Sequence, residues 1–324
     1  MKFLLFPFAS IFWAVVTIRG MLHSLFGREI FLPGAIDVGS VLVGGTGKTA
    51  VVKMLAHHFL SRGEKVAVLS LGYGRRSRGE KVILPGNKAN CDEIGDEPLE
   101  IFSSCNVALG VGKRRERLYN VLVHRGYNRI ILDDAFQYVK ARAAVNIITL
   151  TDALFLPFPV GELRDRMSRI READFVLVKG KRTEALSRII RRFGKQDIAF
   201  DFGYRLSGIY NLATGVKVSL PGENKFFAFS GIAHPDNFFD MLKSEGLSLS
   251  GRKSFPDHHR FSEKEVSSLA GRGYPLLTTE KDRSRLEFLT GNLREKIYIA
   301  KAKIVLDESS RFFRLLEEKL YGTR

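Results

Sequence analysis

Apolar and polar positions in the first half of the chain alternate between buried-strand patterns and amphipathic-helix patterns. Residues 35–43 are small and β-branched, as in a buried strand, and residues 50–63 are apolar at helical spacing and end at a glycine. Further strand-like segments occupy 65–74, 106–112, 128–136 and 144–152, with helix-like segments between several of them. This alternation predicts βαβ units, and therefore a parallel sheet with helices on both faces.

The pattern is interrupted near residues 155–162, "FLPFPVGE", and a second series of strand-like and helix-like segments follows. The chain is also long enough for two domains. We expect four parts: an N-terminal helix at 1–28, an α/β domain that contains the glycine-rich stretch "GGTGKT" at 29–150, a second, smaller α/β domain at 151–296, and a strand and helix at 297–324. Whether that last part packs back on the first domain is left open by the sequence.

The N-terminal segment is apolar from Phe3 to Ile18, with Lys2 and Arg19 at its edges. This run is shorter than the roughly 20 residues of a membrane span. No small-residue cleavage site of a signal peptide follows it. The pattern favours an interfacial helix that lies on a membrane with basic flanks. The alternative is a helix packed on the core of its own domain.

Composition narrows the class of protein. Hydrophobic residues make up 45% of the 324, so the chain can bury a large core and is not of disordered composition. Two cysteines and seven histidines show no disulfide-framework or metal-ligand spacing. The formal net charge of +16 favours a polyanionic partner, namely nucleic acid, anionic lipid or a phosphorylated substrate, and the alternative is a solvated basic surface.

The stretch "LVGGTGKTAV" at 42–51 resembles a phosphate-binding loop, in which glycines and backbone N–H groups surround phosphate and a helix begins directly afterwards. It lies between a predicted strand and a predicted helix, as that motif requires. Leu42 occupies the position where the usual signature has its first glycine, which alters how the strand enters the turn. The candidate nucleotide-binding residues are Leu42, Val43, Gly44, Gly45, Thr46, Gly47, Lys48 and Thr49.

A second motif supports the first. Phosphate-loop enzymes carry an aspartate at the end of an apolar strand to hold magnesium. Here "RIILDD" ends in Asp133 and Asp134, although two aspartates can also simply cap a turn. The combination of both motifs predicts a site for a nucleoside triphosphate with Mg²⁺.

Several motifs further along the chain carry a resemblance to a known family. They are "VGGTGKT" at 43–49, "GYGRRSRG" at 72–79, "GDEP" at 95–98, "DDAFQ" at 133–137, "PVGELRD" at 159–165, "FSGIAHPDNFF" at 229–239, "FPDHH" at 255–259 and "LLTTEKD" at 276–282. In this order and spacing the chain resembles the tetraacyldisaccharide 4'-kinases, the lipid A 4'-kinases of Gram-negative bacteria. That family's own loop lacks the earlier glycine, so Leu42 is normal for it.

The resemblance implies a function. Such a kinase uses ATP and Mg²⁺ to phosphorylate the 4'-hydroxyl of a tetraacylated glucosamine disaccharide 1-phosphate, the lipid A disaccharide precursor. It implies a location at the cytoplasmic face of the inner membrane, as a peripheral or monotopic protein on that anionic surface, and no nucleic-acid partner. The nucleotide loop, the apolar N-terminus and the basic charge agree with it.

The resemblance also implies roles for individual residues. The catalytic set is Lys48 on the terminal phosphates, Arg164 on developing charge or on the lipid's phosphate, and His258 as general base paired with Asp96. The magnesium set is Thr49, Glu97, Asp133, Asp134 and Gln137. Two alternatives remain: His258 can be a turn residue after Pro256, and the basic residues of 75–78 can be a solvated surface loop. His259 is less favoured than His258 because the family motif fixes only the first histidine.

The chain departs from the family pattern at several positions. Leu71 replaces an arginine, Ala135 a glycine and Tyr138 a histidine, and Asp165 with Arg166 follows Arg164 where the family has Glu-Pro. Supporting contacts there can be rearranged. Two rival functions are a membrane-associated P-loop switch ATPase, whose loop needs a lysine at the position of Val43, and a nucleic-acid-binding protein, which needs basic residues interleaved with aromatics.

Overall fold

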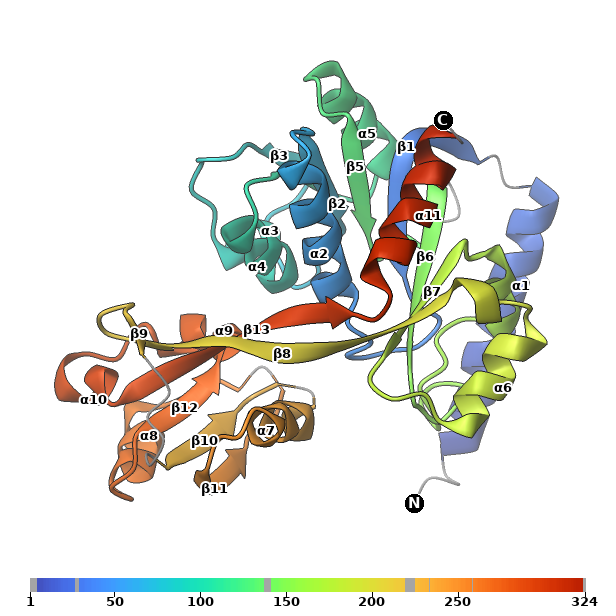
Figure 1. Ribbon diagram of the computed structural model, residues 1–324. Helices are drawn as coiled ribbons and strands as arrows, with labels where there is room; N and C mark the ends of the chain where they lie inside the picture. Colours follow the sequence, from blue (N-terminus) through green and yellow to red (C-terminus); the bar gives the residue numbers. More distant parts are fainter. Residues whose placement is uncertain are drawn as a thin grey trace. The chain divides into compact units, whose positions relative to one another are not determined.

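The computed structural model describes residues 5–26, 29–136, 141–218, 225–232, 234–257 and 259–322. The chain forms two compact units. Met1–Phe202 and Leu306–Arg324 belong to the first, and Gly203–Val305 to the second. The chain leaves the first unit within strand β8 (Ala199–Asn211) and returns to it within strand β13 (Ile297–Leu306) (Figure 1).

The first unit contains strands and helices in alternation. Its strands besides β8 are β1 (Ile30–Gly39), β2 (Val66–Ser70), β3 (Lys81–Ile83), β4 (Ala108–Val111), β5 (Arg129–Asp133), β6 (Ala141–Thr151) and β7 (Phe175–Lys179). Its helices are α1 (Phe6–Phe26), α2 (Lys48–Ser61), α3 (Cys91–Ile94), α4 (Asp96–Ser104), α5 (Arg115–His124), α6 (Glu184–Arg192), α11 (Ser309–Tyr321), and the 3₁₀ turns η2 (Met167–Glu172) and η3 (Gln196–Ile198).

The sheet of the first unit has the strand order β8-β7-β6-β1-β5-β2-β4-β3. All of its pairings are parallel except that of β3 with β4. Strands β2, β4 and β5 are buried at every position, as expected of parallel strands covered on both faces. After β5 the chain crosses to β6 on the other side of β1. The carboxyl end of β1 therefore lies at a topological switch point, where open α/β sheets bind their ligands.

Helices α2 and α11 contribute much of the packing around this sheet. Helix α2 buries apolar residues at helical spacing, and the last helix, α11, buries Phe312 and Leu316. The ring of Phe312 contacts those of Phe175 and Phe200 at centroid distances of 5.3 and 5.4 Å. The C-terminal helix thus completes the core of the first unit.

Helix α1 is apolar on two faces. Its inner face packs on the core of the first unit, with Ala9 and Val16 buried and Trp13 against the cluster under the sheet. Its outer face carries apolar side chains at three- and four-residue spacing, each more than half exposed: Phe8, Ile11, Val15, Ile18 and Leu22. In the described part of the chain, no helix combines the length and the hydropathy that crossing a membrane requires.

The second unit is a smaller α/β unit. Its strand order is β11-β10-β12-β13-β8, with β9 paired antiparallel to β8. Helices α7 and α8 pack on two separate apolar clusters. The elements are β9 (Lys217–Val218), β10 (Phe226–Ser230), α7 (Pro235–Ser244), β11 (Leu249–Ser254), α8 (Glu263–Ala270), β12 (Leu276–Thr279), α9 (Glu280–Arg283), η4 (Ser284–Leu286) and α10 (Gly291–Glu295).

The predicted parallel sheet with helices on both faces is present. The boundaries between the compact units lie at 202/203 and 305/306, whereas the sequence led us to expect domain boundaries at 150/151 and 296/297. The reason is strand pairing: β7 pairs with β6, and the start of β8 pairs with β7. Residues 151–202 therefore extend the first sheet.

Candidate nucleotide-binding site

The glycine-rich loop follows β1 and ends at the first residue of α2. Gly44 and Gly47 have φ values of 86° and 89°, in the left-handed region that favours glycine, and Gly47 is the N-cap of α2. No acidic residue lies in the first turn of α2. The positive end of the helix is therefore available to an anion, as in other phosphate-binding loops.

Leu42 has a packing role at the entrance to the loop. Its side chain is fully buried, and its backbone forms an isolated antiparallel bridge with Leu163. Next to it, the Val43 N–H donates to the Glu162 carbonyl oxygen at 2.7 Å. The "PVGELRD" segment is thereby held against the loop.

Two contacts on the other side of the loop were not foreseen from the sequence. The Thr46 and Thr149 hydroxyls lie 2.8 Å apart, and Lys179 Nζ donates to the Gly45 carbonyl oxygen at 2.8 Å. Thr149 lies on β6 and Lys179 ends β7. The strand patterns contained both residues, but only the pairing order β1-β6-β7 brings them beside the loop.

Lys48, the first residue of α2, has its Nζ 3.9 Å from Asp134 Oδ2, and its side chain is 14% exposed. Thr49 follows in the first turn of the helix. The lysine charge and the threonine hydroxyl therefore lie at the start of α2, directly after the glycines of the loop.

Asp133 ends β5 and is buried. Its Oδ2 accepts a hydrogen bond from Ser70 Oγ at 3.1 Å, whereas its Oδ1 has no partner among the described residues. Burial, followed by repulsion from Glu97 and Asp134, raises the pKa of Asp133 to about 7, against the opposing effects of Lys48 and Ser70. A cation close to Asp133 would therefore stabilise its ionised form and lower its pKa.

Asp134 has a different environment. Its φ of 56° is one of two positive values at described non-glycine residues. The two Nη atoms of Arg164 donate to both carboxylate oxygens, with Nη1 2.8 Å from Oδ2. Burial alone would raise the pKa of Asp134, but the hydrogen bonds and charge of Arg164, together with Lys48, bring it below its ordinary value.

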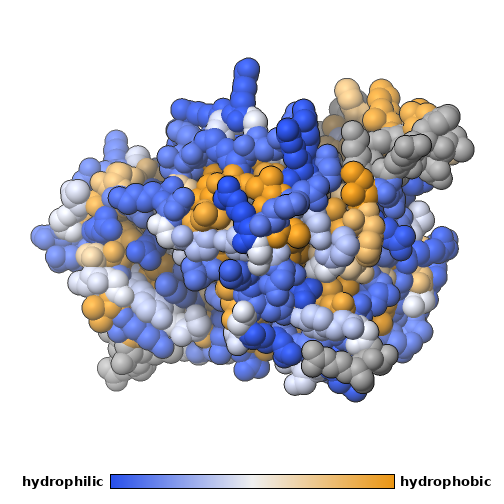
Figure 2. Space-filling model, turned by 90° about the horizontal axis from the view of Figure 1, so that it is seen from above, coloured by the Kyte–Doolittle hydropathy of each residue, from blue (hydrophilic) through white to orange (hydrophobic). Residues whose placement is uncertain are grey.

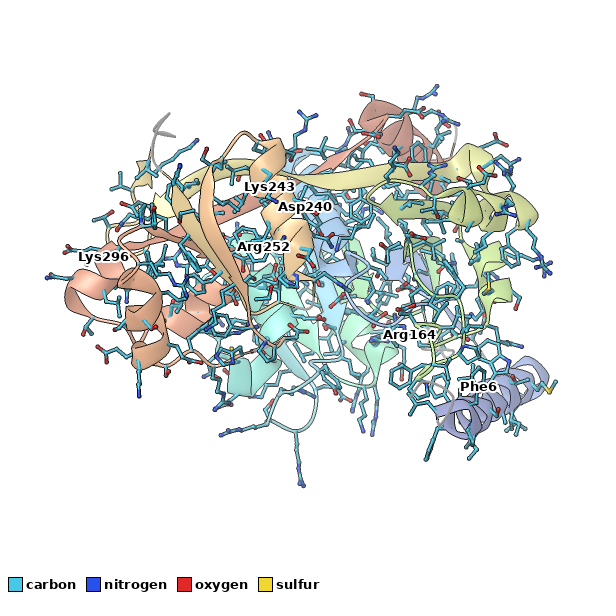
Figure 3. All side chains as sticks on the ribbon, turned by 90° about the horizontal axis from the view of Figure 1, so that it is seen from below. Phe6, Arg164, Asp240, Lys243, Arg252 and Lys296 are labelled. Atoms are coloured by element: carbon cyan, nitrogen blue, oxygen red, sulfur yellow. The ribbon has the colours of Figure 1, made fainter. Side chains whose placement is uncertain are left out.

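Arg164 also donates from Nε to the Ser40 carbonyl oxygen at 3.2 Å, and its own backbone N–H donates to the Val41 carbonyl oxygen at 2.9 Å. The side chain is labelled in Figure 3, on the segment that follows β6. The structure therefore brings together Lys48, Asp134 and Arg164 at the carboxyl ends of the central strands.

Asp96 and Glu97 begin helix α4 and are exposed. Gly95 before them has a φ of 92°, and a Cβ there would lie 2.6 Å from the Tyr73 carbonyl oxygen. The glycine of "GDEP" is therefore needed because its backbone closely approaches that of the "GYGR" motif. The pKa of the nearby Cys91 thiol is raised to about 11 by burial and then by its hydrogen bond with Asp96.

Gln137, Tyr138 and His258 lie outside the described residues. His259 is described: its ring stacks on Phe255 with centroids 4.7 Å apart, and its Nε2 lies 3.2 Å from Glu265 Oε1. Among the described residues, no group of three or more His, Cys, Asp or Glu side chains could hold a metal ion.

A further buried carboxyl lies beneath the site. Asp37 on β1 accepts a hydrogen bond from the Ala135 N–H at 3.1 Å, and burial is the main cause that raises its pKa to about 7. Arg115, buried at the start of α5, attracts it. An aspartate inside an apolar strand pattern belongs to no motif, so sequence reasoning could not single it out. Ala135, where the resemblance leads us to expect a glycine, does not have a positive φ.

The whole chain superposes on a known structure. The crystal structure of the "apo" form of LpxK from Aquifex aeolicus in complex with ATP matches with a TM-score of 0.76 and 26% identity over 99% of both chains. With the loop geometry, this likeness defines a mixed α/β protein of P-loop kinase fold, which confirms the predicted fold class.

The sequence comparisons name the family. The family model described as Tetraacyldisaccharide-1-P 4'-kinase matches residues 1–321. Tetraacyldisaccharide 4'-kinases of Actinobacillus succinogenes and Polaromonas naphthalenivorans are 32% and 30% identical to this chain; the matches cover 86% and 91% of it, and 84% of each relative. The chain therefore belongs to the tetraacyldisaccharide-1-P 4'-kinase family, which confirms the resemblance and the predicted kinase function in lipid A biosynthesis.

Proposed function

We propose that this protein transfers the γ-phosphoryl group of ATP to the 4'-hydroxyl of a tetraacylated glucosamine disaccharide 1-phosphate. The observation that carries the proposal is the convergence of Lys48, Asp134 and Arg164 beside a glycine-rich loop at the start of a helix. Family membership and the ATP complex of the Aquifex aeolicus structure support it.

Phosphoryl transfer depends mostly on positioning and charge neutralisation. We assign Lys48 to the terminal phosphates, which the loop N–H groups and the first turn of α2 also attract. Arg164 neutralises charge that develops on the transferred group, and its bidentate pair with Asp134 holds the guanidinium in one orientation.

Magnesium fits the donors beside the loop, because the buried Oδ1 of Asp133 has no hydrogen-bond partner among the described residues. We propose that Thr49, Glu97, Asp133 and Gln137 hold Mg²⁺ with the nucleotide, where the ion neutralises β- and γ-phosphate oxygens. Asp134 is assigned to Arg164 instead, since both of its oxygens accept from that guanidinium.

The acceptor hydroxyl must lose a proton. We propose His258 as the general base, with Asp96 as the carboxylate that raises its basicity and fixes its tautomer. The described histidine of the same motif, His259, is a weaker candidate because its ring packs between Phe255 and Phe261 and its Nε2 faces Glu265.

We also propose that the protein works on the cytoplasmic face of the inner membrane and has no nucleic-acid partner. Figure 2 shows one face of the molecule, on which hydrophilic residues predominate around several apolar patches. The exposed apolar side chains on the outer face of α1, from Phe8 to Leu22, form a stripe along that helix. Such a stripe on a chain of net charge +16 fits an anionic lipid surface. Retention on anionic vesicles but not on duplex DNA at the same salt concentration tests this part.

The test of the activity is direct. Purified protein is incubated with ATP, Mg²⁺ and a lipid disaccharide 1-phosphate in detergent, and the product mass is measured. A mass increase of one phosphate group, located on the 4'-hydroxyl, supports the proposal. ATP hydrolysis without lipid phosphorylation would favour a switch ATPase instead.

A further inference from the structure

Asp282 is a buried carboxylate of the second unit that no role proposed above uses. It lies in the short helix α9, and none of its surface is exposed. Its carboxylate accepts hydrogen bonds from Ser230 Oγ (2.9 Å), Thr278 Oγ1 (3.2 Å), Thr279 Oγ1 (2.8 Å), the Gly231 N–H (3.2 Å) and Arg285 Nη1 (3.1 Å). Except for Arg285, these donors come from the two motifs "FSGIAHPDNFF" and "LLTTEKD".

A buried charge is costly unless hydrogen bonds and an opposite charge satisfy it. Here hydroxyl, backbone and guanidinium donors all converge on one carboxylate. Arg285 also donates to the Gly231 carbonyl oxygen at 2.9 Å, so both polar groups of that glycine are engaged. The end of β10 is therefore fixed in place by the residues that follow β12.

The end of β10 in turn contacts Phe255 and His259 of the "FPDHH" motif. The Phe255 N–H donates to the Ser230 carbonyl oxygen at 2.9 Å. His259 packs against Gly231 so closely that a Cβ at the glycine would lie 3.2 Å from His259 Cβ. Phe255 and His259 thus rest on Ser230 and Gly231, the two residues that Asp282 holds.

We propose that Asp282 is a positioning residue for phosphoryl transfer: through Ser230 and Gly231 it sets the positions of Phe255 and His259, the described residues on either side of His258 in the "FPDHH" motif. This inference rests on the proposed function, in which His258 is the general base. Asp282 touches neither substrate nor nucleotide in this proposal. Its effect is on kcat, because a reacting group displaced by about 1 Å can cost on the order of 10²-fold in rate.

Two variants test the proposal without removing the buried charge. Gly231→Ala adds a methyl group that presses on His259 and removes no hydrogen bond, and its matched control is Gly203→Ala, where a Cβ meets nothing within 4 Å. Ser230→Ala removes one donor to Asp282, and its matched control is Ser250→Ala, whose hydroxyl donates only to a strand carbonyl. Asp282→Asn is a third variant, and the first two keep the test decisive if it fails to fold.

Steady-state kinetics and the pH profile of kcat/KM are measured for each folded variant, with circular dichroism and Tm as the folding check. We expect Gly231→Ala and Ser230→Ala to lower kcat by about tenfold or more, to leave KM for ATP within about twofold, and to shift the acidic limb of the profile. The controls stay within about twofold of wild type. If Asp282 only stabilises the fold, the variants will lower Tm and change neither kcat nor the acidic limb of the pH profile. That result overturns the inference.

The failure of the proposed function gives a different result. If His258→Ala is as active as wild type, His258 is not the general base, whatever the activities of the Gly231→Ala and Ser230→Ala variants. If His258→Ala is inactive while folded Gly231→Ala and Ser230→Ala variants keep wild-type kcat, only the role of Asp282 is wrong.

Discussion

Arg164 Nη1 donates to Asp134 Oδ2 at 2.8 Å, and the other Nη of the same guanidinium binds the second carboxylate oxygen. A lysine cannot form this two-point contact. We therefore expect Arg164→Lys to lower kcat by about 10²-fold or more, because the charge remains but its orientation is lost. Arg192→Lys, at an exposed position on α6, is the control.

If the role of Asp134 is to orient the Arg164 guanidinium, Asp134→Asn and Arg164→Lys affect the same step of the reaction. The double variant then loses little more than the worse single variant, as expected of contacting residues. Multiplicative losses in kcat would instead give Asp134 a separate role, such as holding Mg²⁺.

Lys48→Ala is expected to abolish phosphate transfer and leave the fold intact. Its charge lies at the mouth of the loop, and its only described ion pair, with Asp134, is long at 3.9 Å. Lys53→Ala is a matched control on the same helix, where Lys53 pairs with Glu100 at 3.4 Å. If a folded Lys48→Ala variant transfers phosphate at nearly the wild-type rate, the assignment of the nucleotide site to this loop is wrong.

Asp37 predicts a pH dependence of stability. Burial is the main cause that raises its pKa from 3.8 to about 7, so between these values the folded protein binds more protons at this site than the unfolded protein does. The free energy of unfolding therefore falls as pH rises from about 4 to 7. Asp37→Asn removes this contribution, and at pH 8 we expect the variant to be more stable by up to about 4 kcal/mol.

Denaturant unfolding at several pH values between 4 and 8 measures this effect. Asp240→Asn, an exposed change on α7, is the control and should follow the wild-type curve. Parallel pH dependences of wild type and Asp37→Asn would contradict the assignment of the effect to this carboxyl.

The outer face of α1 is expected to bind lipid. Replacing Ile11, Val15 and Ile18 with serine removes three exposed apolar side chains, each of which gains about 1.5–3 kcal/mol on full burial. Affinity for anionic vesicles in a sedimentation assay should fall at least about 100-fold, and deletion of residues 1–19 should have the same effect. Val121→Ser with Val123→Ser removes exposed apolar residues from α5 and should change nothing.

Asp96 and His258 are expected to act together. Asp96→Ala should lower kcat strongly, and His258→Ala should lower it by roughly 10²–10⁴-fold if the histidine is the base. The double variant should then be little worse than the worse single one. ATP affinity, measured by titration, should change little, and fully multiplicative losses in kcat would indicate two independent roles.

Local pattern predicted much of the first unit. Helix α2 begins at Lys48 as the loop motif requires, and β5 ends at Asp133 as "RIILDD" indicates. The division of the chain into compact units was harder, because the interruption near 155–162 is a segment held against the phosphate loop by Val43 and Leu42. Strand pairing between distant segments decides such boundaries, and it leaves no periodic signal.

The same limit applies to the site. Lys48, Asp133 and Arg164 could be proposed from the sequence because each lies in a motif whose chemistry is known. Lys179 and Asp37 could not, because a lysine at the end of one strand and an aspartate inside another acquire meaning only when neighbouring strands are placed beside them. Tertiary contacts created these two features.

The route of the chain through the two units has a consequence for biosynthesis. Phe312 and Leu316 of α11 are fully buried in the first unit, yet the ribosome makes them only after the whole of Gly203–Val305. The first unit therefore cannot close its core while the second is being translated. The second unit, a contiguous stretch of chain, can become compact first, and the nascent first unit keeps apolar surface exposed to chaperones until the last helix leaves the ribosome.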